Sequence, residues 1–274
     1  MNFVTIKVSC QQDLIDLLIS ELFEIDFDSF QELADGFEGS CEEKVFSEEK
    51  TNTILSQYPD VTFEVKEQEK INWNEEWEKN YDPIIIEDKC IVRASFHKSQ
   101  PQFEYEIIIT PKMSFGTGHH ATTYQVLDYQ MRLDHTEKKV LDVGTGTGVL
   151  TIMAHKRGAS KLVATDIDDW CVENSTENFA LNKVKDAQII QGQIDKVEEK
   201  EFDLIIANIN KNVLLDQIGR YSERIKQEGE LILSGFYEDD IHDLISIGNE
   251  YQLEKKIHTV RDRWAMLVFI KHSV

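Results

Sequence analysis

The spacing of apolar residues predicts regular elements from the start of the chain. Residues 2–9 alternate between apolar and polar side chains, which predicts a strand because successive strand side chains point to opposite faces. Residues 11–25 predict an amphipathic helix because large apolar residues recur there at helical spacing. These residues are Leu14, Leu17, Leu18, Leu22 and Ile25.

Two further apolar segments, residues 27–34 and 37–46, are separated by Asp35-Gly36, which predicts a hairpin. Ser47 predicts the start of a second helix, and residues 61–67 predict a fourth strand. The order β-α-β-β-α-β is that of a ferredoxin-like α+β domain. Because this part has no glycine-rich loop and no catalytic cluster, we expect it to bind a partner and not to catalyse.

A short helix is predicted over residues 72–79, with Trp73 and Trp77 on one face. Two tryptophans at this spacing usually anchor a linker onto a neighbour; stacking on a ligand is the alternative. Pro83 ends the helix. We therefore predict three parts, which are an N-terminal domain over residues 1–70, a linker over 71–83 and a larger domain over 84–274.

Beyond the linker, predicted strands alternate with predicted helices. The strands are 84–86, 91–94, 104–109, a run ending before Gly144, 161–166, 187–192, 202–208 and 229–235, and the helices are 121–131, 149–157, 169–182, 212–226 and 238–250. Two closing strands, 253–260 and 264–271, are joined at Arg261-Asp262 as a hairpin, so one of them must run antiparallel. The pattern predicts an α/β doubly wound sheet with an antiparallel C-terminal hairpin.

A glycine loop, Asp-Val-Gly-Thr-Gly-Thr-Gly at residues 142–148, joins one strand to the next helix. Glycines allow the turn and let a ligand approach the backbone, but the spacing is not the G-x-G-x-x-G of dinucleotide-binding loops. Asp142 beside the loop would repel a pyrophosphate and suits an amino group. Asp166, at the end of the following strand, is placed to accept hydrogen bonds from ribose hydroxyls. S-adenosylmethionine, which has an amino group, a ribose and no phosphate, fits this combination.

Asn208 ends the predicted strand 202–208, at the edge where open α/β sheets bind ligands. Its side-chain carbonyl is suited to hold an amine nucleophile whose lone pair faces the sulfonium methyl group. A helix N-cap is the alternative interpretation, because that position also favours Asn.

The 274-residue chain has a net charge of −22, and residues 1–80 supply −14 of it through 20 acidic and six basic residues. Nucleic acid is disfavoured as a direct partner because phosphate binding needs a basic surface. A basic partner would be attracted, although an acidic surface that only confers solubility is the alternative.

No apolar run reaches about 18 residues, which argues against a membrane span. The four cysteines lie far apart without a C-x-x-C pair, so we expect reduced thiols, a cytoplasmic location and no metal site. We also expect a monomer.

Several motifs together resemble the bacterial methyltransferases of the eleventh protein of the large ribosomal subunit (L-eleven). They are Met-Ser-Phe-Gly-Thr-Gly-His-His-Ala-Thr-Thr at 113–123, the glycine loop at 142–148, Asp166-Ile167-Asp168, Ala207-Asn208-Ile209, and Asn72-Trp73-Asn74-Glu75-Glu76-Trp77 in the linker. The resemblance covers residues 72–274 well, and the acidic N-terminal domain by architecture. Its specific part is Phe-Gly-Thr-Gly-x-His, since class I methyltransferases in general share the glycine loop.

The resemblance implies a class I methyltransferase that transfers methyl groups from S-adenosylmethionine to the N-terminal α-amine and lysine ε-amines of the basic protein L-eleven. It also implies that the N-terminal domain recognises the substrate, which gives its negative charge a function. The cofactor-binding positions that we predict are Thr123, Gly144, Asp166 and Asn208 from the resemblance, together with Asp142, Gly146, Phe115 and Thr117 from the two glycine loops. Ala121, Thr145 and Thr147 differ from the residues common in the family, and these are small changes within loops.

The chemistry demands mainly orientation and desolvation, because the sulfonium is already an activated leaving group. We expect Asn208 to position the amine and residues 115–120 to close over the cofactor. A lysine, with a reference pKa of about 10.4, must first lose its proton; His119 and His120 are candidate bases, though loop histidines are more often structural. The absence of a Pro-Pro-aromatic sequence after Asn208 argues against nucleobase or glutamine substrates. The alternatives are a class I methyltransferase for another protein or small-molecule amine, and a binding module that keeps the pocket without catalysis.

Overall fold

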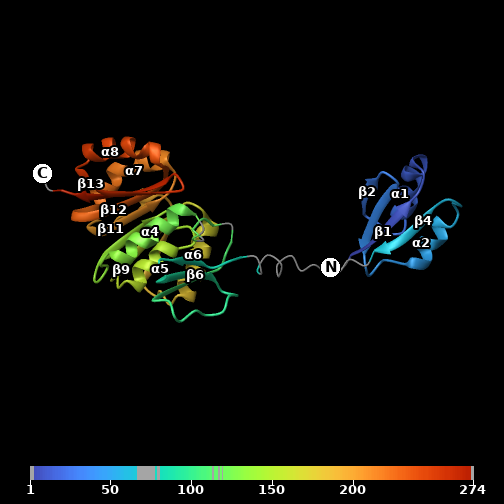
Figure 1. Ribbon diagram of the computed structural model, residues 1–274, viewed down its shortest axis with the longest axis horizontal. Helices are drawn as coiled ribbons and strands as arrows, with labels where there is room; N and C mark the ends of the chain where they lie inside the picture. Colours follow the sequence, from blue (N-terminus) through green and yellow to red (C-terminus); the bar gives the residue numbers. More distant parts are fainter. Residues whose placement is uncertain are drawn as a thin grey trace. The chain divides into compact units, whose positions relative to one another are not determined.

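The computed structural model describes residues 3–66, 78, 81–112, 114–116, 118 and 120–272. The chain divides into two compact units, Met1–Tyr81 and Asp82–Val274 (Figure 1). The predicted linker helix over residues 72–79, with Trp73 and Trp77, lies outside the described residues except for Glu78. In the described part of the chain, no helix is long and apolar enough to cross a membrane.

The N-terminal unit is a four-stranded antiparallel sheet packed against helices. Its strands are β1 (Phe3–Ser9), β2 (Ser29–Leu33), β3 (Gly36–Glu42) and β4 (Thr62–Lys66), in the order β2-β3-β1-β4. Its helices are the 3-10 helix η1 (Gln12–Leu14), α1 (Ile15–Phe23) and α2 (Glu48–Leu55). This arrangement confirms the predicted ferredoxin-like fold.

Apolar periodicity explains this unit. Ile6 of β1 and Phe37 of β3 are fully buried in one cluster with Leu18 of α1, so the alternating face of the sheet meets the apolar face of the helix. Ser47 is the N-cap of α2, and its side chain accepts a hydrogen bond from the main-chain N–H of Lys50 (3.3 Å). The hydroxyl thus satisfies a helix donor that would otherwise lack an intrahelical partner.

The second unit is built around a seven-stranded sheet in the order β10-β9-β8-β11-β12-β14-β13. Its strands are β8 (Lys139–Val143), β9 (Lys161–Asp166), β10 (Ala187–Gln191), β11 (Phe202–Asn208), β12 (Ile225–Tyr237), β13 (Leu253–Arg261) and β14 (Trp264–Lys271). The strands β8 to β12 pair in parallel, whereas β14 is antiparallel to both β12 and β13. The predicted doubly wound sheet with an antiparallel C-terminal hairpin is therefore confirmed.

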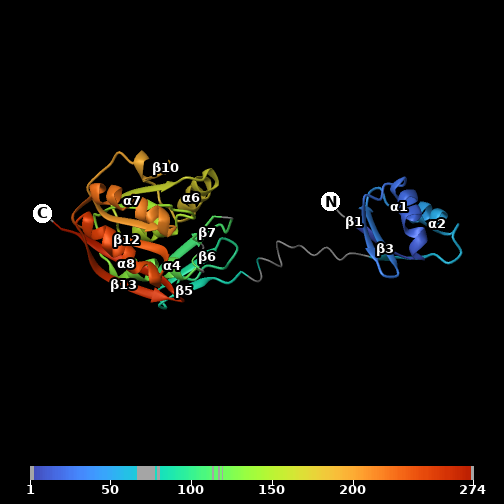
Figure 2. The same cartoon turned by 90° about the horizontal axis from the view of Figure 1, so that it is seen from above.

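Helices cover both faces of this sheet (Figure 1). On one face lie α4 (Ala121–Arg132), α5 (Val149–Lys156) and α6 (Asp169–Leu181), and on the other lie α7 (Lys211–Arg224) and α8 (Ile241–Glu250). The short 3-10 helices η2 (Ile194–Lys196) and η3 (Glu238–Asp240) lie in connections. A separate three-stranded sheet, β5 (Ile84–Ile86), β6 (Cys90–Ala94) and β7 (Tyr105–Ile109), shares the apolar core of α4, α5 and α6 (Figure 2).

The largest difference from the sequence prediction lies between α7 and β12. A helix over 212–226 and a strand over 229–235 were expected, but the helix ends at Arg224 and the strand runs from Ile225 to Tyr237. Ile225 pairs with Phe202 of β11, and the register then shifts before β12 resumes its pairing. Pairing with a neighbouring strand thus overrides the local helical pattern, which sequence periodicity does not register.

Candidate active site

The carboxyl ends of the parallel strands form the floor of one pocket. Because β8, β9 and β11 run in the same direction, they bring the glycine loop, Asp166 and Asn208 to one edge of the sheet. The pocket has a volume of about 550 Å³, which is within the range of small-molecule sites. Of the predicted site residues, Phe115, Gly144, Gly146, Asp166 and Asn208 line it.

The glycine loop at residues 142–148 directly contacts the earlier loop that contains Phe115 and Gly116. Gly146 has a φ of 57°, and an added Cβ atom there would lie 2.2 Å from the carbonyl oxygen of Phe115. Thr147 donates its main-chain N–H to that same oxygen (2.9 Å) and its hydroxyl to the carbonyl of Gly116 (2.6 Å). The two glycine-rich segments that the sequence singled out therefore form one structure. Thr117 and His119 lie outside the described residues.

Asn178 of α6 secures the same loops from behind. Its Oδ1 accepts the main-chain N–H of Thr110 (2.8 Å), at the end of β7, and its Nδ2 donates to the carbonyl of Thr147 (2.8 Å). The side chain is fully buried. One amide thus connects the small sheet to the glycine loop.

Asp142 lies beneath the glycine loop and is fully buried. Its Oδ2 accepts hydrogen bonds from the hydroxyls of Thr145 (2.7 Å) and Thr151 (2.8 Å), and its Oδ1 has no partner among the described residues. Burial raises the pKa of Asp142 to about 6, although both hydroxyl hydrogen bonds act to lower it. Asp142 does not line the pocket. It supports the loop from below, and its direct contact with a ligand stays a prediction.

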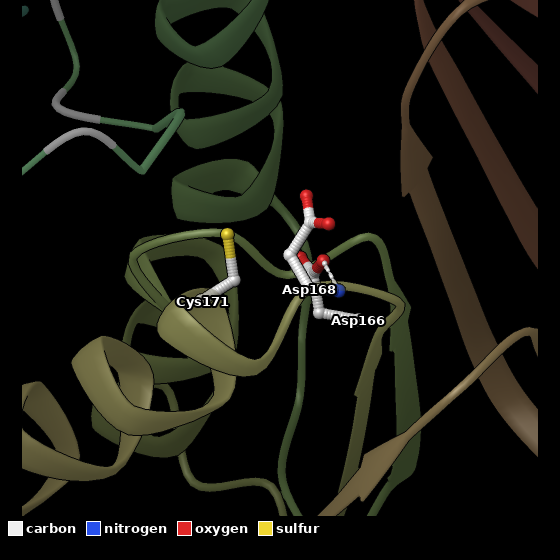
Figure 3. Close-up of side chains that lie close together, drawn as sticks. All are labelled: Asp166, Asp168 and Cys171. Atoms are coloured by element: carbon white, nitrogen blue, oxygen red, sulfur yellow. Dashed lines mark hydrogen bonds between the residues drawn. The ribbon is translucent and has the colours of Figure 1, made fainter.

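Asp166 faces the pocket from the end of β9. Its Oδ2 accepts the N–H of Gly146 (2.8 Å) and its Oδ1 accepts the N–H of Asp168 (3.2 Å), as Figure 3 shows for the second bond. A carboxylate oxygen has more than one lone pair, so both atoms can also accept from ribose hydroxyls. The side chains of Asp168 and Cys171 come within 4.8 Å of it, and the thiol is free.

Asn208 is held at one end and unpaired at the other. Its Nδ2 donates to the hydroxyl of Thr123 (3.3 Å), while its Oδ1 is buried without a hydrogen-bond partner among the described residues. Thr123 is fully buried behind it and does not line the pocket. The alternative role as a helix N-cap belongs to Asn210, whose side chain accepts from the N–H of Asn212 (2.9 Å). Asn208 is therefore free to serve the pocket.

Aromatic side chains that the sequence analysis did not select form part of the wall. Trp264, at the start of β14, contacts the ring of Tyr237 with centroids 4.2 Å apart and the planes tilted by 30°, and it meets the ring of His120 at 4.5 Å. His120 in turn contacts Phe115 at 5.3 Å. His120 is the N-cap of α4, and its Nδ1 lies 2.8 Å from the hydroxyl of Thr122. One feature of the sequence could have indicated Trp264: it begins the second strand of the predicted C-terminal hairpin, which returns beside the sheet.

The chemistry of the lining fits S-adenosylmethionine. Among the described residues that line the pocket, none is Lys or Arg, so no side-chain cation is provided for a phosphate. Ile167 and Trp170 supply apolar surface, and Asp166 supplies acceptors for a ribose. The unpaired Oδ1 of Asn208 can accept an N–H or face a positive centre. These features favour a cationic, phosphate-free nucleoside.

Comparison with known sequences identifies the family. The family model described as Ribosomal protein L11 methyltransferase (PrmA) matches residues 19–272. A ribosomal protein L11 methyltransferase of Phocaeicola vulgatus is 39% identical over 267 residues, covering 95% of this chain and 95% of the relative. A protein of the same name from Porphyromonas gingivalis is 42% identical over 266 residues, covering 94% of this chain and 91% of the relative.

Solved structures agree with this result. The ribosomal protein L11 methylase of Lactobacillus delbrueckii subsp. bulgaricus has a TM-score of 0.66 and 29% identity, covering 70% of this chain and 100% of that chain. A methyltransferase of Pyrococcus furiosus, with a TM-score of 0.53 and 18% identity, covers 61% of this chain and 90% of that chain and shows the shared fold. The predicted class I methyltransferase with S-adenosylmethionine as its cofactor is confirmed. The chain belongs to the ribosomal protein L11 methyltransferase family.

Proposed function

We propose that this protein transfers methyl groups from S-adenosylmethionine to the N-terminal α-amine and lysine ε-amines of ribosomal protein L11. Family membership over nearly the whole chain supports this substrate. The structural observation that carries the proposal is the buried, unpaired Oδ1 of Asn208 at the edge of a pocket whose described lining contains no Lys or Arg. An acceptor in that state costs free energy unless a ligand donor satisfies it.

The residues of the pocket account for the orientation of the acceptor amine. S-adenosylmethionine, when bound, supplies a methyl group on a positively charged sulfonium. Asn208 accepts an N–H of the incoming amine on Oδ1, and the bond from its Nδ2 to Thr123 fixes the amide plane. The nitrogen lone pair is thereby held in one direction, which is the main requirement of an in-line transfer.

The walls of the pocket account for the desolvation of the acceptor amine. Phe115 and Trp264 present aromatic surface next to His120, and apolar surroundings favour the neutral amine over the ammonium ion because burying a charge is costly. The Nδ1 atom of His120 is engaged by Thr122. A role of His120 or His119 as general base stays a prediction.

We assign substrate recognition to residues 1–70, with residues 71–83 as linker and 84–274 as the catalytic domain. Some acids of the N-terminal sheet and its turns are paired with lysines, as Glu38 of β3 is with Lys66 and Asp35 of the β2–β3 turn is with Lys7. By contrast, the exposed acids of α1 and the residues flanking it take part in none of the ion pairs between described residues. These acids, Asp13, Asp16, Glu24 and Asp26, lie close in the sequence to the exposed apolar residues Leu17 and Phe23.

Such a surface suits a basic protein. Unpaired negative charge attracts it and sets its orientation, and the apolar side chains offer area to bury on contact. The overall charge of −22 also supports our proposal that the protein binds neither nucleic acid nor membrane directly. We further propose that it acts in the cytoplasm as a monomer.

The direct test is incubation of the protein with isotopically labelled S-adenosylmethionine and purified ribosomal proteins that lack methylation. Label is expected in L11, on its N-terminal residue and on lysines, as read by mass spectrometry of its peptides. The Asn208→Ala variant serves as the control for contaminating activity. Label confined to another protein or to a small amine would overturn the substrate assignment, and failure to bind the cofactor in calorimetry would overturn catalysis as well.

A further inference from the structure

A single buried side chain fastens the C-terminal hairpin to α4. Gln125 of α4 is 6% exposed. Its Nε2 donates to the main-chain carbonyl of Trp264 in β14 (3.1 Å), and its Oε1 accepts from the hydroxyl of Thr259 in β13 (2.7 Å). One amide therefore binds both strands of the hairpin, close to the turn that joins them.

That attachment adds to the sheet pairing that holds the hairpin, in which Trp264 also pairs with Tyr237 of β12. Trp264 pairs with Arg261 across the turn, and the two turn residues between them have positive φ. The guanidinium carbon of Arg261 also lies over the ring of Tyr124, 3.6 Å from its centroid, which adds a contact near the N-terminal end of α4. The position of the Trp264 ring therefore depends both on the pairing of β14 with β12 and on how the hairpin is docked to this helix.

The same helix also contacts the side chain of Asn208. Thr123 of α4 accepts the Nδ2 hydrogen bond of Asn208, and His120 at the start of α4 meets the ring of Trp264. Within six residues, α4 thus contacts both the amide proposed to hold the amine and the aromatic wall. A buried amide that uses both its ends has few alternative arrangements. Gln125 therefore fixes the hairpin that carries Trp264 relative to α4, which contacts Asn208.

We propose that Gln125 is a positioning residue for methyl transfer. It touches neither substrate nor cofactor; it holds Trp264 in the wall at a fixed position relative to Asn208, and so controls how well the acceptor amine is oriented. The inference rests on the proposed function, because it concerns the same pocket. A small misplacement of an orienting group lowers transfer without a comparable loss of cofactor affinity.

The test compares two glutamines of α4. Gln125→Met keeps the length of the side chain and removes both hydrogen bonds. Gln130→Met is the matched control, because Gln130 is fully buried in the same helix and donates to a main-chain carbonyl, that of Leu150 (3.1 Å), away from the pocket. Both variants are expected to lower the Tm. Only Gln125→Met is expected to lower kcat/KM for L11, by about tenfold, with the Kd for S-adenosylmethionine within about twofold of the wild type.

A spectroscopic measurement separates positioning from general loosening. In protein labelled with 5-fluorotryptophan, the ¹⁹F resonance of Trp264 is assigned by its loss in Trp264→Phe. Gln125→Met is expected to shift or broaden this resonance and to leave that of Trp170 in place, whereas Gln130→Met is expected to change neither.

An unchanged kcat/KM and an unchanged Trp264 resonance in Gln125→Met would overturn the inference, as would equal kinetic losses in the two variants. If the wild type methylates no amine of L11, the proposed substrate fails. The fluorine spectra then still decide whether Gln125 positions Trp264.

Discussion

The two units of this protein use polar residues in opposite ways. In the N-terminal unit, acids such as Asp16 and Glu24 are exposed and take part in no ion pair between described residues. In the catalytic unit, Asp142, Asn208 and Gln125 are buried, and each makes specific hydrogen bonds. The first arrangement suits attraction of a partner over a distance, and the second suits the fixing of atoms within a pocket.

The difference has an energetic basis. An exposed charge pair contributes about 0–1 kcal/mol and is screened by salt. Loss of a buried hydrogen-bonding partner costs about 1–3 kcal/mol because the remaining group is left unsatisfied. Substitutions in the catalytic unit are therefore expected to have large, local effects, and those on α1 small, salt-dependent ones.

The largest effect is expected at Asn208. Asn208→Ala should lower kcat for methylation of L11 by about 100-fold or more, because the amine loses its orienting acceptor. The Kd for S-adenosylmethionine, measured by calorimetry, should stay within about threefold. Asn182→Ala is the control: this amide bonds the backbone of Ile108 (3.0 and 2.6 Å), so its loss should lower the Tm and not kcat. Equal losses of turnover and cofactor affinity in Asn208→Ala would refute the positioning role.

The buried His135 should govern part of the acid sensitivity. Burial lowers the pKa of His135 from 6.5 to about 4, so the unfolded chain takes up a proton before the folded protein does. Stability is therefore lost as the pH falls from about 6.5 towards 4, by about 3 kcal/mol in total. In His135→Gln this loss disappears. Urea unfolding at pH 7 and pH 4.5 measures it, and parallel changes in wild type and variant would contradict the assignment.

Asp142 should change the stability with pH in the opposite direction to His135. Its folded pKa of about 6 lies above the ordinary 3.8, so its contribution to stability is present below pH 3.8 and is lost as the pH rises through 6. Asp142→Asn removes this dependence. Relative to the wild type, the variant should gain up to about 3 kcal/mol between pH 4 and pH 7.5. A constant difference in the free energy of unfolding across that range would show that Asp142 does not titrate as its burial implies.

The smallest effect is expected on α1. The double variant Asp16→Lys/Glu24→Lys should raise KM for L11 by about three- to tenfold at low salt, with kcat unchanged, and the difference should shrink as salt increases. Glu198→Lys/Glu250→Lys, on exposed sites of the catalytic unit, changes the net charge equally and is the control. Equal responses of the two variants would show that net charge, and not the α1 surface, attracts the substrate.

Much of the fold was accessible from the sequence because its signals are local. Asp35-Gly36 marks the first hairpin, Ser47 caps α2, and the glycines at 144–148 mark the strand–helix turn. The boundary at Ile225 was missed because that residue is recruited into β12 by Phe202, a partner far away in the sequence. Local patterns carry no information about such a pairing.

The residues of the site also divide into those that local sequence signals predict and those that they do not. Asp166 and Asn208 were predictable because parallel strands bring their carboxyl ends to one edge. Trp264 reaches the pocket only through the returning hairpin, and Gln125 looks like an ordinary helix residue in the sequence. The sequence also left open whether Asn208 caps a helix; the structure gives the cap of α7 to Asn210, because that helix begins at Lys211.

The bridge made by Asn178 has a practical consequence for shortening the enzyme. Since this amide ties Thr110 at the end of β7 to the carbonyl of Thr147, the three-stranded sheet is structurally continuous with the ligand cradle. A minimal catalytic fragment should therefore retain everything from Ile84 onward. Truncation of the chain after β7 would break this connection and leave the glycine loop without its support.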